Sequence, residues 1–315
     1  MARLAFLFPG QGSQYVGMGK DLYDSNSSVR ELFALAEETT GLPLTRLCFE
    51  GPMEELTETV NLQSAITLVN LCLYQALQVA GVTPQAACGH SLGEYSALFA
   101  AGVLNAGDTL AVVKERGRLM QREANKHPGA MTAIIGLAPE KLAALLEPLL
   151  SQGPLSLANF NTPEQTVVSG TPELVARAGE VCKAAGARAV PLKVSGAWHS
   201  PLMAAASPDF AAFLKSLEFQ APRLPLYLNA TAAPETDPVR LRQAMGGQLT
   251  SPVRWADLIL NLKSAGIDTW VEVGPKNVLK GLVRKILPQE PGENFFNVEN
   301  RDTLSRFVEA WSAWA

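Results

Sequence analysis

The chain has 315 residues, of which 47% are hydrophobic and 18% are charged. These proportions are typical of a well-packed globular protein and exclude a disordered chain. The formal net charge of −4 gives no reason to expect nucleic acid, which usually requires a clustered basic face. No stretch approaches the roughly 20 apolar residues of a membrane helix, so we expect no membrane association.

Metal ligands are scarce in this sequence. Three histidines and four cysteines (Cys48, Cys72, Cys88 and Cys182), without a short paired spacing, supply a metal site poorly, so we expect no metal. Unpaired thiols are typical of the cytoplasm, where we expect the protein to reside. The apolar run 4–8 is too short for an export signal and stops at Pro-Gly, which favours a buried first strand.

The first part of the chain predicts a parallel sheet. A strand at 4–8 leads into the turn PGQGSQ, and a short strand of small residues is expected within 84–90. Helical patterns occupy residues 28–41, 64–81, 92–104 and 108–125. Strands and helices in this order are typical of a parallel sheet covered by helices.

The segment that follows has a different rhythm. It predicts, in order, a strand at 131–137, a helix at 139–150, strands at 154–161 and 166–170, a helix at 172–186 and a strand at 187–194. This β-α-β-β-α-β order is typical of a ferredoxin-like unit.

Beyond it the α/β alternation returns. Strands are expected at 225–230, 269–275 and 294–298, and helices near 239–249, 254–259 and 277–287 and at the C-terminal end. We therefore expect an α/β fold in which a large α/β-hydrolase-like domain, residues 1–128 and 196–315, carries an inserted ferredoxin-like subdomain, residues 129–195.

Ser91 is the first candidate functional residue. It lies in GHSLGEYSAL, after a predicted strand and before a predicted helix. A nucleophile elbow needs small residues two positions either side of the serine, because the backbone turns sharply there, and Gly89 and Gly93 meet this need. The Oγ would then lie at a helix N-terminus, where free N–H groups stabilise an oxyanion. The alternative is a serine that only begins a buried helix, and the strand-turn-helix context favours the nucleophile.

A serine nucleophile needs a base, and the histidines can be sorted by elimination. His90 adjoins Ser91, so its side chain should point elsewhere, and His127 lies in an exposed-looking turn. His199 follows the last strand of the inserted unit, and a domain junction is a natural cleft wall, which favours His199. The only aspartate between Ser91 and His199 is Asp108, which looks like a helix N-cap. We therefore expect a Ser-His dyad.

Arg116 interrupts an apolar helix face. In the predicted helix 108–125 it is three or four positions from Val112, Val113, Leu119 and Met120. A buried guanidinium is costly unless an anion meets it. That anion could be a structural carboxylate or a substrate carboxylate held by two hydrogen bonds. The spacing alone leaves both possibilities open.

Five features occur in one order: FPGQGSQ, GHSLGEYSAL, Arg116, GAWHSPLM and EVGP. With them the chain resembles the malonyl-CoA:acyl carrier protein transacylases of fatty acid synthesis, and it is similar to the acyltransferase domains of polyketide synthases. The resemblance covers nearly the whole chain. It implies that Ser91 becomes malonylated, that His199 is its base and that Arg116 binds the free malonyl carboxylate.

Further roles are also implied by the resemblance. The backbone N–H groups of Gln11 and Leu92 would form the oxyanion hole, and the backbone carbonyl of Gln248 would orient the histidine in place of an aspartate. Trp198 stands where phenylalanine is more usual, and its bulk should crowd the α-methyl group of methylmalonyl. Ordinary turn chemistry is the alternative for both glutamines.

The activity implied is ping-pong transfer of malonyl from malonyl-CoA to the phosphopantetheine thiol of acyl carrier protein, without a metal or bound cofactor. Two alternatives are a thioester hydrolase of the same fold, which Arg116 disfavours, and a non-catalytic docking module. Carrier proteins of this kind are acidic, so a basic patch is a candidate docking surface. The candidate patch consists of Lys276, Lys280, Arg284 and Lys285. An ordinary solvent-exposed helix face is an equally good interpretation of these four residues. We expect a monomer.

Overall fold

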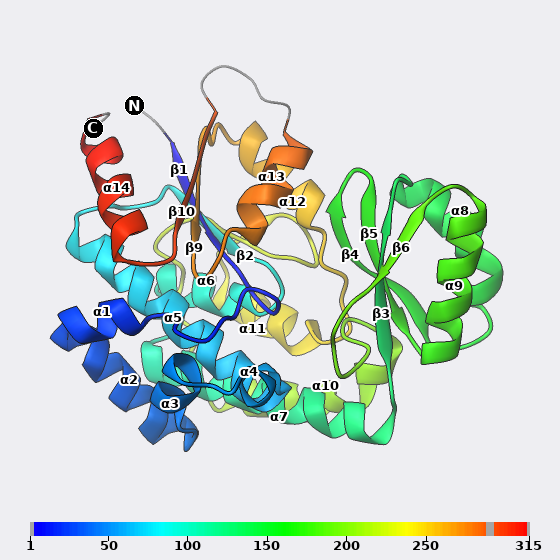
Figure 1. Ribbon diagram of the computed structural model, residues 1–315, viewed down its shortest axis with the longest axis horizontal. Coiled ribbons are helices and arrows are strands. Elements are labelled where there is room, and N and C mark those ends of the chain that lie inside the picture. The colour runs from blue at the N-terminus through cyan, green and yellow to red at the C-terminus, as the bar shows by residue number, and fades with distance from the viewer. Residues whose placement is uncertain (1–2, 288–292, 314–315) are drawn as a thin grey trace.

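The computed structural model describes residues 3–287 and 293–313. Within them, a six-stranded sheet of order β10-β9-β1-β2-β7-β8 lies beside a separate four-stranded sheet (Figure 1). The larger sheet consists of β1 (Leu4–Phe8), β2 (Ala86–Gly89), β7 (Leu226–Tyr227), β8 (Pro234–Glu235), β9 (Thr269–Val273) and β10 (Asn294–Val298). Its neighbouring strands are parallel, except that β7 and β8 are antiparallel. The predicted α/β class with a mostly parallel sheet is confirmed.

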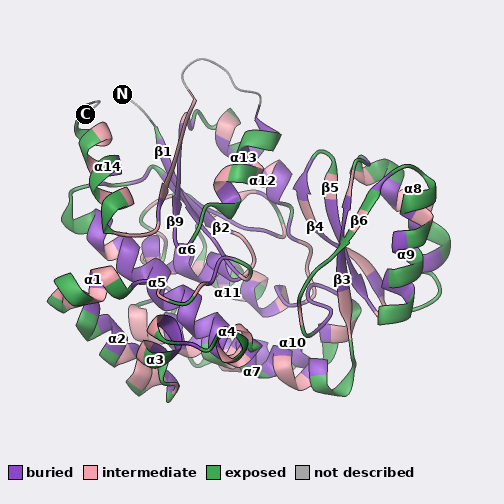
Figure 2. Ribbon diagram, in the orientation of Figure 1, coloured by how far each residue is buried: buried purple, intermediate pink, exposed green. Residues whose placement is uncertain are grey.

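Helices pack on both faces of the larger sheet and on one face of the smaller sheet (Figure 1). In the described residues they are α1 (Lys20–Ser25), α2 (Ser27–Thr40), α3 (Leu44–Phe49), α4 (Met53–Thr57), α5 (Thr59–Val79), α6 (Gly93–Ala100), α7 (Ala106–Lys126), α8 (Pro139–Leu150), α9 (Pro172–Ala184), the 3₁₀ helix η1 (Pro201–Ala206), α10 (Ser207–Lys215), α11 (Pro238–Gly247), α12 (Trp255–Ser264), α13 (Val278–Ile286) and α14 (Arg301–Ser312). Buried residues concentrate on the larger sheet and on α5, whereas α8 and α9 expose their outer faces (Figure 2).

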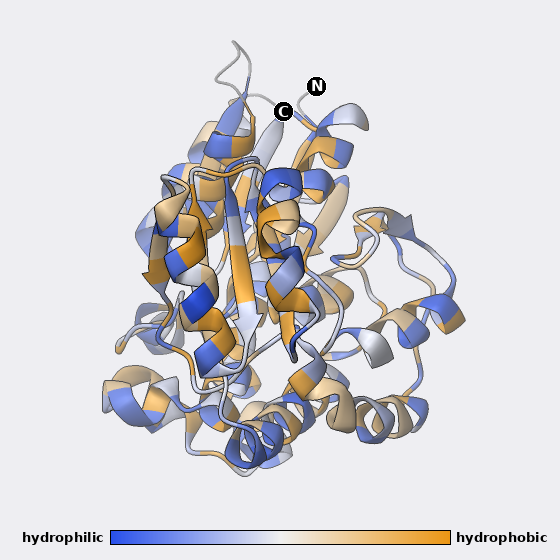
Figure 3. Cartoon of the chain, turned by 90° about the vertical axis from the view of Figure 1, so that its right-hand side faces the viewer, coloured by the Kyte–Doolittle hydropathy of each residue, from blue (hydrophilic) through white to orange (hydrophobic). Residues whose placement is uncertain are grey.

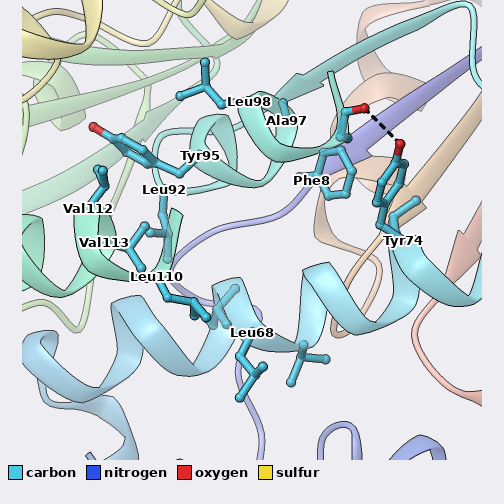
Figure 4. Packing of buried hydrophobic residues seen from close by; sticks show 14 of the residues in the cluster. Phe8, Leu68, Tyr74, Leu92, Tyr95, Ala97, Leu98, Leu110, Val112 and Val113 are labelled. Atoms are coloured by element: carbon cyan, nitrogen blue, oxygen red, sulfur yellow. Dashed lines mark hydrogen bonds between the residues drawn. The ribbon is translucent and has the colours of Figure 1, made fainter. Parts of the chain in front are cut away.

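The side chains of β1 divide the core of the larger sheet into two layers. Leu4, Phe6 and Phe8 pack with α2, α5 and α7 on one face, while Ala5 and Leu7 pack with α12 and α13 on the other. This division follows from the pleat, since successive side chains of a strand point to opposite faces. Figure 4 shows the first layer, where Phe8 lies beside the Tyr74 ring of α5. A strand covered on both faces accounts for the unbroken apolar run LAFLF.

The smaller sheet has the strand order β4-β5-β3-β6 and is antiparallel. Its strands are β3 (Ala130–Ile135), β4 (Leu155–Thr162), β5 (Gln165–Gly170) and β6 (Arg188–Pro191). The first and third strands are central, as in a ferredoxin-like unit. Figure 3 views the molecule from this side, with α8 and α9 in front of the sheet and hydrophobic positions alternating with hydrophilic ones along both helices. These elements lie within the expected subdomain 129–195, whose boundaries stay a prediction.

Two predicted strands are shorter in the structure. The strand expected at 187–194 ends at Pro191, because the chain turns at Leu192, whose carbonyl accepts the Val194 N–H at 3.0 Å. The strand expected at 225–230 is limited to Leu226–Tyr227, since Leu228 begins a reversal that leads into β8. His199 consequently lies in a turn between β6 and η1 and not at the end of a strand.

The expected helix cap at Asp108 is wrong. Asn105 caps α7, because its Oδ1 accepts the Asp108 backbone N–H at 2.8 Å, and Asp108 lies in the first turn. Sequence patterns also missed six short elements, none longer than nine residues, namely α1, α3, α4, η1, α10 and the strand β8. In the described part of the chain no helix is long and apolar enough to cross a membrane.

Candidate active site

Ser91 lies in the sharp turn between β2 and α6. Its φ of 51° is in the left-handed region, which a non-glycine residue adopts only when its surroundings enforce it. A Cβ at Gly89 would lie 2.0 Å from the Gly93 carbonyl, and one at Gly93 would lie 1.9 Å from the Phe8 carbonyl oxygen. Only glycine fits at these two positions, so the turn expected from GHSLG is present.

Asn229 fixes this turn from outside it. Its Oδ1 accepts the Ser91 backbone N–H at 2.7 Å, and its Nδ2 donates to the Gly89 carbonyl at 2.7 Å. Asn229 follows β7, the neighbour of β2 in the sheet. Sequence reasoning missed it, although a polar residue just beyond a strand at the carboxyl edge of a parallel sheet is a usable signal.

Ser91 and His199 are hydrogen-bonded. The distance from Ser91 Oγ to His199 Nε2 is 2.7 Å, and His199 Nδ1 lies 2.8 Å from the Ser251 carbonyl oxygen and 3.2 Å from that of Gln248. Because both partners of Nδ1 only accept, Nδ1 carries the proton and Nε2 is left to accept. Gln248 was expected in this position from the resemblance. Ser251, whose carbonyl oxygen is the nearer of the two acceptors, was missed because a contact made by a backbone carbonyl does not depend on the side chain.

The imidazole of His199 is held neutral. Burial and, after it, the nearby Arg116 charge lower its pKa to about 3, while the hydrogen bonds to the carbonyls of Ser251 and Gln248 act in the opposite direction. A neutral imidazole with a free Nε2 can take the serine proton. Of the other histidines, His90 lines the same cavity, but its Nε2 hydrogen-bonds Asn161 at 2.8 Å and not Ser91 Oγ, and His127 is exposed as expected.

Arg116 is 1% exposed and points at the serine. Its Nη2 donates to Ser91 Oγ at 3.1 Å, its Nε to Gln248 Oε1 at 3.0 Å and its Nη1 to Gln63 Oε1 at 2.5 Å. No carboxylate among residues 3–287 and 293–313 forms an ion pair with it. The guanidinium thus donates hydrogen bonds to neutral side-chain amides. Gln63 of α5 was not predicted, since a glutamine within a long helix has no distinguishing pattern.

A cavity of about 250 Å³ lies between the two sheets. The predicted site residues line it, except Gln248, which lies behind Arg116: Gln11, Ser91, Leu92, Arg116, Trp198 and His199. Met131 and Val167 of the smaller sheet form one wall, and Val278 and Leu282 of α13 form part of the opposite one. Neither the Gln11 nor the Leu92 backbone N–H donates to another described residue, so both can receive an oxyanion.

Metal binding is poorly supported by these side chains. No group of three or more His, Cys, Asp and Glu side chains within the described ranges could hold a metal ion. The four cysteines are buried and free.

The fold and the serine turn place the chain among the α/β enzymes with a serine at a strand-to-helix turn. Residues 5–303 match the family described as "Acyl transferase domain". The malonyl CoA-acyl carrier protein transacylase of Bacillus subtilis (strain 168) is 41% identical over 288 residues, which are 91% of each chain.

Solved structures agree with this match. A crystal structure of an acyl carrier protein S-malonyltransferase from Vibrio cholerae has a TM-score of 0.92 at 39% identity, covering 97% of this chain and 100% of that one. A malonyl-transacylase in complex with a type II polyketide synthase acyl-carrier protein has a TM-score of 0.93 at 37% identity, covering 98% and 100%. The chain belongs to the acyl transferase family, in its branch of malonyl CoA-acyl carrier protein transacylases.

Proposed function

We propose that the protein transfers a malonyl group from malonyl-CoA to the phosphopantetheine thiol of an acyl carrier protein. The observation that carries the proposal is the buried Arg116 guanidinium, 3.1 Å from Ser91 Oγ and without a carboxylate partner in the described residues. A thioester with a free carboxylate at its far end supplies the missing anion, which the planar guanidinium can hold through two hydrogen bonds.

The first half-reaction acylates the serine. His199 Nε2 accepts the Ser91 proton while Oγ attacks the thioester carbonyl carbon of malonyl-CoA. The tetrahedral oxyanion accepts hydrogen bonds from the backbone N–H groups of Gln11 and Leu92, and each such donor is worth about 3–4 kcal/mol. The C–S bond then breaks, and the leaving sulfur takes the proton from His199 Nε2.

The second half-reaction reverses these roles. The carrier-protein thiol gives its proton to His199 Nε2 and attacks the malonyl ester, the oxyanion is held as before, and Ser91 Oγ leaves with that proton. The Nδ1–H of His199 stays on the carbonyls of Ser251 and Gln248 throughout, which keeps the imidazole in one tautomer. The sequence of steps requires neither a metal nor a bound cofactor.

Intact-protein mass measurement tests this proposal. Malonyl-CoA alone should add one malonyl group to the protein, Ser91→Ala should add none, and holo acyl carrier protein should then remove the group as malonyl-carrier. Rapid release of free malonate without a carrier protein would instead indicate a thioester hydrolase. Failure of every acyl-CoA to label Ser91 would indicate a docking module without catalysis.

Trp198 is proposed to exclude branched acyl groups. Its side chain is 5% exposed and lines the cavity next to His199. Trp198→Ala should raise acylation by methylmalonyl-CoA relative to malonyl-CoA by about 10- to 100-fold, the discrimination typical of one methyl group in a tight pocket. Competition between the two thioesters, read by mass, measures the ratio. Trp198→Phe keeps an aromatic wall and serves as the control; an unchanged ratio in the alanine variant would remove this role.

The docking surface is proposed to lie on α13. Lys276, Arg284 and Lys285 are exposed, while Lys280 is half-buried and donates to Asn297 Oδ1 at 3.3 Å. The same helix contributes to the cavity wall, so a carrier bound there could reach Ser91 with its thiol arm. Charge attraction to an acidic carrier acts mainly on association.

Charge reversal tests this surface. The double variant Arg284→Glu/Lys285→Glu should raise the KM for holo acyl carrier protein about tenfold or more and leave the KM for malonyl-CoA unchanged, with the salt dependence of transfer reduced. Lys141→Glu/Lys183→Glu, on the outer helices α8 and α9, reverses the same number of charges and is the matched control. Equal effects in both variants would place the docking surface elsewhere.

Two further proposals concern the oligomeric state and the cellular location of the protein. Ser91, His199 and Arg116 come from one chain, so the site is complete without a partner subunit, which supports a monomer. Four buried free thiols support a reducing compartment such as the cytoplasm. Light scattering of the purified protein tests the first of these.

A further inference from the structure

Glu94 is a buried carboxylate that the proposed mechanism does not use. It lies in the first turn of α6 and is 1% exposed. Its Oε1 accepts the Asn229 backbone N–H at 2.6 Å, and its Oε2 accepts Gln248 Nε2 at 2.8 Å. We propose that Glu94 is a positioning residue that holds the Arg116 guanidinium ready for the substrate carboxylate, acting through the side-chain amide of Gln248. The inference rests on the proposed role of Arg116.

The amide of Gln248 joins an anion to a cation. Its Nε2 donates to Glu94, and its Oε1 accepts from Arg116 Nε at 3.0 Å. An ionised carboxylate only accepts hydrogen bonds and a guanidinium only donates them, so the two charges together fix which way the amide points. The amide also donates to the Ser91 carbonyl oxygen at 2.8 Å, which ties this bridge to the nucleophile turn.

An amide between the charges leaves the guanidinium available. A direct ion pair would place a carboxylate on the outer N–H groups of Arg116, where the substrate must bind. Here the amide uses only Nε, while Nη2 faces Ser91 Oγ. Glu94 thus offsets the cost of burying the Arg116 charge without contacting Arg116 itself, since Gln248 lies between them. Through the same amide it orients the guanidinium plane.

The second oxygen of Glu94 acts on a different target. Oε1 holds the backbone N–H of Asn229, whose side chain clamps the backbone of Ser91 and Gly89. A defect in this arm would slow acylation by every donor equally. A defect in the arm through Gln248 would slow donors that carry a carboxylate more than donors that do not. Comparing malonyl-CoA with acetyl-CoA therefore separates the two arms.

The ionisation of Glu94 gives an independent readout. Burial raises its pKa to about 7, opposed by the hydrogen bonds from Asn229 and Gln248 and by the Arg116 charge. The other titratable groups that face it are the thiol of Cys88 in β2 and the phenol of Tyr95 in α6, and burial raises the pKa of both, so they stay neutral. Below its pKa, Glu94 carries a proton and cannot accept both of its hydrogen bonds. The grip on a carboxylate should then weaken as the pH falls through this range.

The test is the ratio of Ser91 acylation rates with malonyl-CoA and acetyl-CoA. Glu94→Gln is nearly isosteric, but its NH₂ group must face either the Asn229 N–H or the Gln248 Nε2, both of which are donors. The variant should lower this ratio about tenfold or more, as expected for the loss of one hydrogen bond to a charged group. In the unmodified protein the ratio should fall between about pH 8.5 and pH 6, and in Glu94→Gln it should be flat. Glu123→Gln removes another buried glutamate, on α7, and should leave the ratio unchanged.

Several outcomes would overturn the inference. An unchanged ratio in Glu94→Gln, or an equal loss with both donors, would reduce Glu94 to a structural role. If that variant does not fold, Gln248→Met replaces it, since it removes the connecting amide and keeps the backbone carbonyl, and an unchanged ratio there would have the same meaning. Failure of the Arg116 role itself is distinguishable, because Arg116→Ala would then leave the ratio unchanged, whatever Glu94→Gln does.

Discussion

Replacing His199 by alanine is expected to slow the acylation of Ser91 by malonyl-CoA by roughly 10⁶-fold, the loss typical when the base of a serine nucleophile is removed. The physical reason is the single hydrogen bond from Ser91 Oγ to a neutral imidazole at 2.7 Å. Rapid-quench mass measurement of the acyl-enzyme gives the rate. His127→Ala is the matched control, because His127 is exposed, and its rate should stay within about twofold of the parent.

The same prediction has a pH signature. Since burial lowers the pKa of His199 to about 3, the imidazole is a free base at any pH well above this value. Acylation of the Glu94→Gln variant by acetyl-CoA, a donor without a carboxylate, should therefore show no loss near pH 6.5, the ordinary pKa of histidine, because no carboxylate titrates beside the serine turn in that variant. An inflection at that pH would mean that the imidazole titrates as it does in water, and it would contradict its proposed environment.

Replacing Arg116 by alanine should reverse the preference of the enzyme. Malonyl-CoA loses the cation that holds its carboxylate, at a cost of about 2–5 kcal/mol, which is roughly 30- to several thousand-fold in the acylation rate. Acetyl-CoA, which would leave the guanidinium unpaired in the parent, should lose little or gain. Parallel acylation assays with both donors measure the change.

The control for Arg116 lies on the same helix. Arg118 is exposed and paired with Glu115, so Arg118→Ala should leave both rates nearly unchanged. Similar malonyl and acetyl rates in the parent enzyme would contradict the carboxylate grip outright. Parent-like selectivity in Arg116→Ala would show that another group recognises the carboxylate.

Long periodic segments and motif residues could be predicted from the sequence. The helix expected at 139–150 has those bounds as α8, because two turns of regular apolar spacing and a leading proline define it. Ser91, Arg116 and His199 were found because each breaks a local rule: a serine between obligatory glycines, a cation in an apolar stripe and a histidine at a junction. Their meeting within one cavity required the motif resemblance as well as the pattern.

The supporting residues could not be found in this way. Three of them come from separate segments of the chain: Gln63, Asn229 and Ser251. Each contacts the site through a side-chain amide or a backbone carbonyl, and such groups are too common in any sequence to mark a site. Glu94 did leave a signal, since it is a charge within the apolar run of α6. That signal resembles the one from Arg116. Sequence patterns do not reveal the neutral amide that connects them, because Gln248 lies 154 positions from Glu94 and 132 positions from Arg116.

The central place of β1 has a consequence for synthesis and truncation. This strand, which is made before both of its neighbours, is flanked by β2 on one edge and by β9 on the other. The second edge stays open until residues 269–273 have left the ribosome. A chain cut before them would present a bare apolar strand, the kind of edge on which other chains aggregate. Loss of the C-terminal segment should thus yield insoluble material and not a smaller working enzyme.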